Sequence, residues 1–141
     1  MKRDHLHDLG LIIDDLDAMG RLARVKGHVY LRFDLAGIAA EFEGGPRALL
    51  FEKVMGRDHP VFTGLYWSRE LLGALMRTDE LALPAFVSDC IKAWQAEPVD
   101  PVVVDSGPVL EITEDTVDLE TMPIPIHALK DDATTSSSTS L

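Results

Sequence analysis

A short uninterrupted apolar run at residues 48–51 limits the possible folds of this chain more than any other feature. Runs of this length without polar alternation are typical of a strand that is buried on both faces of a sheet. Amphipathic helical patterns occur before and after it, so helices are available to cover both faces. The pattern predicts an α/β fold, a mixed sheet flanked by amphipathic helices.

Local signals mark where the helices begin. Asp8 is a suitable N-cap for a first helix that Gly20 ends, and Ser68 is a suitable N-cap for a helix over residues 69–76. Pro84 fits the first turn of a helix that runs to Ala96. A further helix is predicted from residue 34 up to the Gly-Gly-Pro stop at 44–46.

Strands are predicted from β-forming residues bounded by turns. Residues 22–31 read as one bent strand or a strand pair around Lys26 and Gly27, and residues 60–63 read as the partner of the 48–51 run. Further strand-like runs occur at 102–104, 109–112 and 117–119. By themselves these three runs predict a terminal hairpin that docks on the first sheet.

The chain divides into three parts by composition. Residues 1–97 are predicted to form the α/β domain, residues 98–127 a β-strand segment, and residues 128–141 a polar, disordered tail, since Ser and Thr bury little apolar surface. The segment before the tail contains Pro123 and Pro125, which favour an extended backbone.

Charge and cysteine content exclude several classes of protein. The net charge is −11 and the thirteen Lys and Arg residues are scattered, which excludes nucleic-acid binding and leaves docking to a basic partner open. No apolar run is long enough to span a membrane, and the N-terminus does not resemble a signal peptide. Cys90 is the only cysteine, which indicates a reducing compartment and predicts a cytoplasmic protein.

No group of residues in the sequence forms a recognisable active site. Asp14, Asp15 and Asp17 are predicted to be a solvated helix face, because neighbouring helical side chains diverge and no calcium-loop spacing accompanies them. The glycines at 44, 45 and 56 lack the spacing of a phosphate-binding loop. The five histidines are isolated in sequence; they are His5, His7, His28, His59 and His127.

Cys90 is predicted to be a buried, inert thiol. It shares one side of its helix with Phe86, Val87, Ile91 and Trp94, which is the pattern of a core-facing stripe. Both tryptophans, at 67 and 94, are expected to pack in the core.

Four stretches together resemble the N-terminal part of the UbiD family of decarboxylases. They read LDAMGRLARV at 16–25, RALLFEKVMGRDHPV at 47–61, LYWSRE at 65–70, and MPIPIH at 122–127 followed by Lys130 and Asp131. They occur in the family's order across nearly the whole chain. The last stretch resembles the join to the family's flavin-binding domain, so the resemblance implies that residues 98–127 open that domain's barrel. His127 lies in this stretch, which leads toward the family's cofactor site.

The resemblance implies an activity that the chain does not carry alone. Members use prenylated FMN, with a divalent metal and often potassium, to decarboxylate aromatic or α,β-unsaturated acids reversibly. The family's catalytic Arg/Glu/Glu set and its metal and flavin ligands fall outside the matched stretches. The resemblance therefore assigns no catalytic, cofactor-binding or metal-binding residue here, and no cofactor is expected to bind to this chain alone.

The sequence also departs from the family pattern in three places. Tyr66 and Trp67 stand where a Phe-Gly pair is expected, and Thr63 and Gly64 where a Gly-Asn pair is common. After Lys130 and Asp131 the usual glycine-rich stretch is replaced by Ala, Thr and Ser. These changes leave the predicted fold intact and bear on the competence of the chain as a lone decarboxylase.

Three functional hypotheses follow, and whether the chain itself is an enzyme stays open. The first is an N-terminal domain or subunit of a UbiD-like decarboxylase, inactive alone, whose residues 102–126 hold a flavin-bearing partner subunit. The second is a non-catalytic, acidic interaction or regulatory protein derived from that domain. The third, an independent enzyme with a novel site, has no supporting motif.

Overall fold

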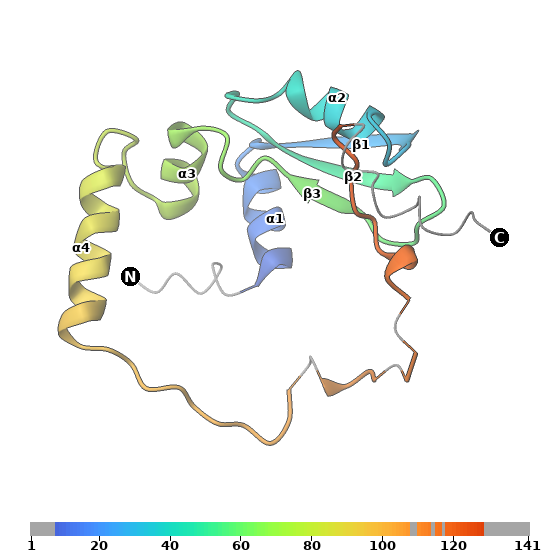
Figure 1. The fold of residues 1–141 in the computed structure, drawn as a ribbon. Helices are drawn as coiled ribbons and strands as arrows, with labels where there is room; N and C mark the ends of the chain where they lie inside the picture. Colours follow the sequence, from blue (N-terminus) through green and yellow to red (C-terminus); the bar gives the residue numbers. More distant parts are fainter. Residues whose placement is uncertain (1–7, 108–109, 114, 117, 129–141) are drawn as a thin grey trace.

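The computed structural model describes residues 8–107, 110–113, 115–116 and 118–128. Within these residues helices and strands are interspersed along the chain, with β2 followed directly by β3 and α3 by α4 (Figure 1). In chain order the elements are α1 (Leu9–Ala18), β1 (Leu22–Val29), α2 (Asp34–Ala40), β2 (Ala48–Val54), β3 (Val61–Thr63), α3 (Arg69–Met76), α4 (Leu83–Ala96) and η3 (Leu119–Thr121).

The sheet is mixed, as the sequence predicts, and its strand order is β1-β2-β3. β1 and β2 are parallel and are joined through α2, whereas β2 and β3 are antiparallel neighbours. The predicted bend in the first strand is a register shift between Val25 and His28, where β1 has one residue more than β2. Gly27 lies inside this irregularity, where a strand glycine often marks a bulge.

β2 is the central strand and is buried on both faces, which confirms the interpretation of the 48–51 run. Ala48 and Leu50 face a cluster formed with α1 and α3, while Leu49 and Phe51 face a second cluster formed with α2. This alternation follows from the two-residue period of a strand. The domain is therefore a three-layer arrangement, with α1 and α3 on one face of the sheet and α2 on the other (Figure 1).

The predicted helix signals act as expected. The side chain of Asp8 accepts a hydrogen bond from the backbone N–H of Leu11 at 3.2 Å, and Ser68 accepts one from Leu71 at 3.1 Å. Gly20 has a φ of 68°, the left-handed conformation that favours glycine after a helix. Pro84 lies in the first turn of α4. Local sequence therefore accounts for the boundaries of α1, α3 and α4.

The strands predicted at 102–104, 109–112 and 117–119 are not formed in the described part of that segment. None of its described residues is in a strand; Leu110 lies in a 3-10 turn and Leu119–Thr121 form η3. Val102 and Val103 are 84% and 91% exposed, so no neighbouring strand covers them. β-propensity mainly reflects packing against neighbouring strands, and these valines have none within the described residues.

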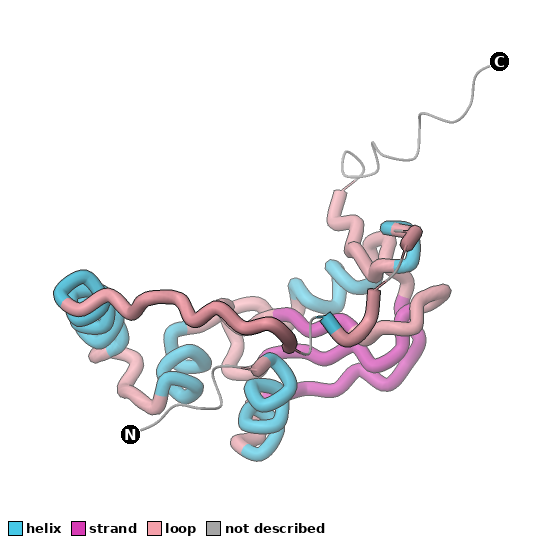
Figure 2. The backbone as a smooth tube through the Cα atoms, turned by 90° about the horizontal axis from the view of Figure 1, so that it is seen from below, coloured by secondary structure: helices cyan, strands magenta, loops and turns pink. Residues whose placement is uncertain are grey.

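The proline-containing segment returns to the domain and pairs with the connection between β1 and α2. Ile126 donates its backbone N–H to the carbonyl of Leu31 at 3.0 Å and accepts from the N–H of Phe33 at 3.1 Å. These bonds form an isolated parallel bridge between Arg32 and Ile126. We call residues 122–127 the return segment. Figure 2 shows that the chain leaves the body after α4, runs in an extended path and rejoins the body near α2.

The return segment meets the domain at a strained turn. Phe33 has a φ of 69°, and the carbonyl of Arg32 accepts from the N–H of Asp34 at 2.9 Å, which makes a γ-turn centred on Phe33. A positive φ is costly for a bulky residue. The side chain of Arg57 adds a second attachment, because its Nε donates to the carbonyl of Met122 at 3.2 Å.

Candidate functional site

Cys90 and Trp94 are exposed, which corrects the prediction that both lie in the core. Along α4 the apolar side forms one continuous stripe. Leu83 at its N-terminal end is buried and Phe86 is half-buried, whereas Val87, Ile91 and Trp94 are 42%, 51% and 64% exposed. The helical pattern was read correctly, but within the described residues only the N-terminal end of this side is covered.

α4 is anchored at its N-terminal end and projects from the domain. Among the other helices and strands, α3 is its main packing partner. Figures 1 and 2 both show α4 at the edge of the molecule, beyond α3 and away from the sheet. We call Val87, Cys90, Ile91 and Trp94 the α4 stripe.

The chain continues from the α4 stripe into a second exposed apolar segment. Val99, Val102, Val103 and Val104 are all exposed, and we call residues 99–104 the valine segment. This part of the chain is also acidic. From residue 93 to residue 129 the sequence contains no Lys or Arg and eight acidic residues, at 97, 100, 105, 111, 114, 115, 118 and 120.

The helical apolar period of residues 86–94 predicts a core-facing side, but in the structure that side is the exposed α4 stripe. An amphipathic period shows that a helix face needs cover, and it does not show which polypeptide supplies the cover. The long stretch without basic residues, directly after the stripe, was the feature that set this part of the chain apart.

Two acids of the predicted solvated face form ion pairs. Asp17 binds Arg24 at 2.7 Å, and Asp15 lies 3.6 Å from Arg77. Asp14 is exposed. No group of three or more potential ligands that could hold a metal ion occurs in the described part of the chain. The structure thus brings these acids to basic side chains instead of to each other.

Arg24 joins three elements of the domain. Arg24 lies on β1. Its guanidinium donates to Asp17 on α1 at 2.7 Å and to Glu52 on β2 at 3.1 Å. Hydrogen bonds to Asp17 and then to Glu52 raise the pKa of Arg24 above its ordinary value. Arg24 therefore stays positively charged between the carboxylates of Asp17 and Glu52, and we assign it a role in holding α1, β1 and β2 together.

The histidines do not converge. His28 on β1 and His59 in the loop between β2 and β3 are both exposed, and His5 and His7 lie outside the described residues. His127 borders a shallow hollow of about 280 Å³ between α2 and the end of β3, together with Ala36, Ala39, Glu43, Thr63 and Trp67. Trp67 also packs against the core cluster under α2, as predicted.

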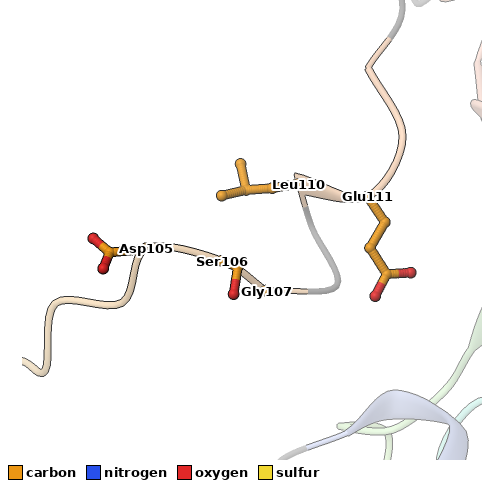
Figure 3. Close-up of a pocket in the computed structure, with 5 residues that line it drawn as sticks. All are labelled: Asp105, Ser106, Gly107, Leu110 and Glu111. Carbon is orange, nitrogen blue, oxygen red and sulfur yellow. The ribbon is translucent and has the colours of Figure 1, made fainter.

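Two further hollows are open and acidic. One is lined by Arg21, Glu70, Thr78, Asp79 and Glu80, where Arg21 is already paired with Glu70. The other is formed by a single loop, and Figure 3 shows that its Asp105 and Glu111 side chains point away from one another. Neither has the converging groups that an acid–base or metal site requires.

The lining of these hollows does not fit a flavin. A flavin phosphate is held by backbone N–H groups at a helix start or by free cations. The hollow beside His127 carries Glu43 and no Lys or Arg, and the one beside Arg21 carries three carboxylates. Within the described residues we therefore assign no flavin ligand.

Membrane insertion through a helix finds no support either. None of the helices in the described ranges has the combined length and apolar content that crossing a bilayer requires.

Comparison with known proteins gives the chain a family. Residues 13–91 match the model of the 3-octaprenyl-4-hydroxybenzoate carboxy-lyase N-terminal domain, UbiD_N. A Rhodospirillum rubrum protein described as "Uncharacterized protein in cooM 5'region" is 67% identical over 124 residues, which are 88% of this chain and 27% of that protein.

Solved structures of the UbiD-class enzyme HmfF from Pelotomaculum thermopropionicum share the fold. An evolved dimeric form in complex with prFMN is 32% identical with a TM-score of 0.73, over 86% of this chain and 28% of that one. The enzyme in complex with FMN is 31% identical with a TM-score of 0.69, over 83% and 26% of the two chains. The sequence given thus spans little more than a quarter of the length of these relatives. With more than half of its residues matched by the family model, the chain belongs to the UbiD family as an N-terminal domain.

Proposed function

We propose that this domain is the N-terminal module of a prenylated-FMN-dependent decarboxylase that acts reversibly on aromatic or α,β-unsaturated carboxylic acids. The flavin, the divalent metal and potassium would be held by a separate flavin-bearing region, on the same polypeptide or on a partner subunit. The module itself would be inactive alone. The single cysteine, Cys90, supports a cytoplasmic location.

The observation that carries this proposal is the match to HmfF. At 32% identity and a TM-score of 0.73, the match covers 86% of this chain and includes an enzyme in complex with prFMN. In the hollows beside His127 and Arg21, the charged lining residues are mainly acidic and Arg21 is already paired with Glu70, which is a poor setting for a flavin phosphate. Both observations support a protein in which this domain positions the flavin-bearing region and that other region carries out the decarboxylation.

The exposed residues of the α4 stripe and the valine segment suggest how this domain would position the flavin-bearing region. The α/β body is rigidly packed around β2, while the α4 stripe and the valine segment expose apolar side chains. Exposed apolar surface of this kind marks a contact with another body. The module would therefore position a neighbouring region, and it would supply no group to the reacting atoms.

Co-expression tests the proposal. The chain is produced together with the flavin-binding region encoded in the same or the adjacent reading frame, in cells that supply prenylated FMN. We expect a complex, or one longer polypeptide, that absorbs in the visible and releases CO2 from an aromatic or α,β-unsaturated acid. The chain purified alone, with prenylated FMN and metal added, should be colourless and inactive.

Two results would contradict the proposal. Decarboxylation by the chain alone would show that it has its own site. A complex with an unrelated basic protein, without any effect on flavin uptake, would favour the acidic interaction or regulatory role instead. The absence of basic residues from 93 to 129 is the observation that keeps this second role in consideration.

A further inference from the structure

We propose that the α4 stripe and the valine segment form one continuous docking surface for the flavin-bearing region of a UbiD-class enzyme. This inference rests on the proposed function and assigns it to particular residues. The occupant is a surface with an apolar centre and a rim of Lys and Arg.

The geometry of α4 indicates an external partner. Its apolar side begins under α3, where Leu83 is buried, and continues through Val87, Ile91 and Trp94 without cover from the described residues. The opposite side carries Asp89 and Lys92, whose side chains are 76% and 72% exposed, and needs no cover. Tryptophan is among the residues most enriched at the centres of protein interfaces.

The valine segment extends the same surface. Only Glu97 and Pro98 separate the end of α4 from Val99, so the two apolar stretches are consecutive in the chain. Figure 1 shows that the segment leaves the C-terminal end of α4 and runs away from the sheet. A body that covers one stretch is therefore adjacent to the other.

Charge specifies the rim of the partner. Glu97, Asp100 and Asp105 flank the exposed valines, and no Lys or Arg lies nearby in sequence to neutralise them. Complementary charges at a rim direct the encounter of two surfaces and exclude wrong partners. The partner's rim should accordingly be basic, and its rate of association should fall as salt is added.

A second copy of this chain does not meet these requirements. In a symmetric dimer the same patch faces itself, so the acids beside each valine segment would face like charges. The net charge of −11 adds to this repulsion. The flavin-bearing region is the better occupant, because HmfF, which shares this domain's fold, extends well beyond the part that this chain matches.

The reactivity of the Cys90 thiol measures whether the α4 stripe is covered. Cys90 is exposed, it lies on the α4 stripe, and it is the only cysteine of the chain. The probe is the flavoprotein that contains this domain, with the flavin-bearing region on the same polypeptide or co-expressed with it. Labelling of the Cys90 peptide by a maleimide is followed by mass spectrometry in this flavoprotein and in the chain alone. We expect labelling in the flavoprotein to be slower by about tenfold or more, since a covered thiol reacts only through local opening.

A matched variant tests the assignment to one side of α4. In Cys90→Ala/Asp89→Cys the only thiol of the chain moves to the polar side of the same helix, where Asp89 is exposed. This thiol should label at the same rate in both samples.

The possible outcomes separate the two proposals. An intact flavoprotein in which Cys90 labels as fast as in the free chain would overturn the docking surface and leave the proposed function standing. Failure to obtain any flavin-containing assembly would count against the proposed function itself. Protection of Cys90 in the chain alone, increasing with its concentration, would identify a second copy as the occupant and contradict the inference.

Discussion

Ile126 donates its backbone N–H to the carbonyl of Leu31, at 3.0 Å, and so joins the return segment to the connection between β1 and α2. The carbonyl of Ile126 completes the link by accepting from Phe33. Pro125 immediately before it has no N–H to offer. The alternation of prolines with donating residues thus leaves the N–H of Ile126 available for this contact.

Replacing Ile126 with proline should detach the return segment. The variant loses the donor to Leu31 and weakens the acceptor to Phe33, at about 1 kcal/mol per hydrogen bond. Amide hydrogen exchange of Phe33 should accelerate by roughly 30-fold if both bonds are lost. The amide of Ala48, which donates to Arg21 inside the body, should exchange at its original rate.

Ile124→Ala is the control for this variant. Ile124 is exposed and its N–H bonds locally to Met122. Unchanged exchange at Phe33 in Ile126→Pro would show that the return segment is not attached there.

Gly64 should not tolerate alanine. Its φ is 91°, and an added Cβ would lie 2.6 Å from Cε3 of Trp67. Backbone strain and displacement of the indole should together cost roughly 2–4 kcal/mol of unfolding free energy. Urea unfolding measures the loss, and Trp67 fluorescence in a Trp94→Phe background should shift to longer wavelength.

Gly37→Ala should have the opposite effect. Gly37 lies within α2 and has open space around its Cα. Alanine favours the helix and restricts the unfolded chain, so the free energy of unfolding should rise by about 0.5–1 kcal/mol. A loss of stability here of the size expected for Gly64→Ala would contradict the described packing of α2.

Phe51 should be the most sensitive core position of β2. It is fully buried in the cluster under α2, and its replacement by alanine should cost about 3–5 kcal/mol. Val103→Ala, at a side chain that is 91% exposed, should change the stability of the isolated chain by less than about 0.5 kcal/mol. Thermal unfolding of the two variants side by side measures the difference.

Arg24→Met should destabilise the domain in a salt-dependent manner. The pKa of Arg24 is raised by Asp17 and Glu52, so the folded state holds the proton more tightly than the unfolded chain. The stabilisation is thus present at every pH below the ordinary arginine pKa and is lost only as pH rises through the raised value. Salt is the practical variable, and the difference from the unsubstituted chain should shrink as salt is added.

Lys92→Met supplies the comparison for Arg24. Lys92 pairs with Asp89 on the exposed side of α4 at 3.5 Å, and both side chains are mostly exposed. Such pairs contribute little, so no measurable change is expected. Equal effects of the two variants would show that Arg24 does not join its three elements.

The sequence was sufficient for features that depend on neighbouring residues. The caps at Asp8 and Ser68, the stop at Gly20 and the doubly buried 48–51 run each follow from local chemistry, and the structure confirms them. The family resemblance is confirmed by the match over residues 13–91.

The wrong predictions concern surfaces that need a partner. Trp94 and Cys90 were assigned to a core because their helix is amphipathic, and Val102 to a strand because valine favours sheets. The core assignment of Cys90 and Trp94, and the hairpin docked on the first sheet, both assume that the cover is provided by the same domain; the resemblance instead places residues 98–127 at the start of the flavin-binding barrel. The three histidines in the described residues gave no site, since nothing in their spacing brings them together.

The bond between Ile126 and Leu31 also sets an order of events in folding. The sheet pairs Leu22 with Ala48 and Leu50 with Phe62, contacts that close short loops, whereas Ile126 closes a loop several times longer. Loop closure costs more entropy as the loop lengthens, and distant contacts form more slowly. On a ribosome the sheet is complete before Ile126 is synthesised. The body is therefore the template on which the acidic, apolar stretch between α4 and the return segment later settles.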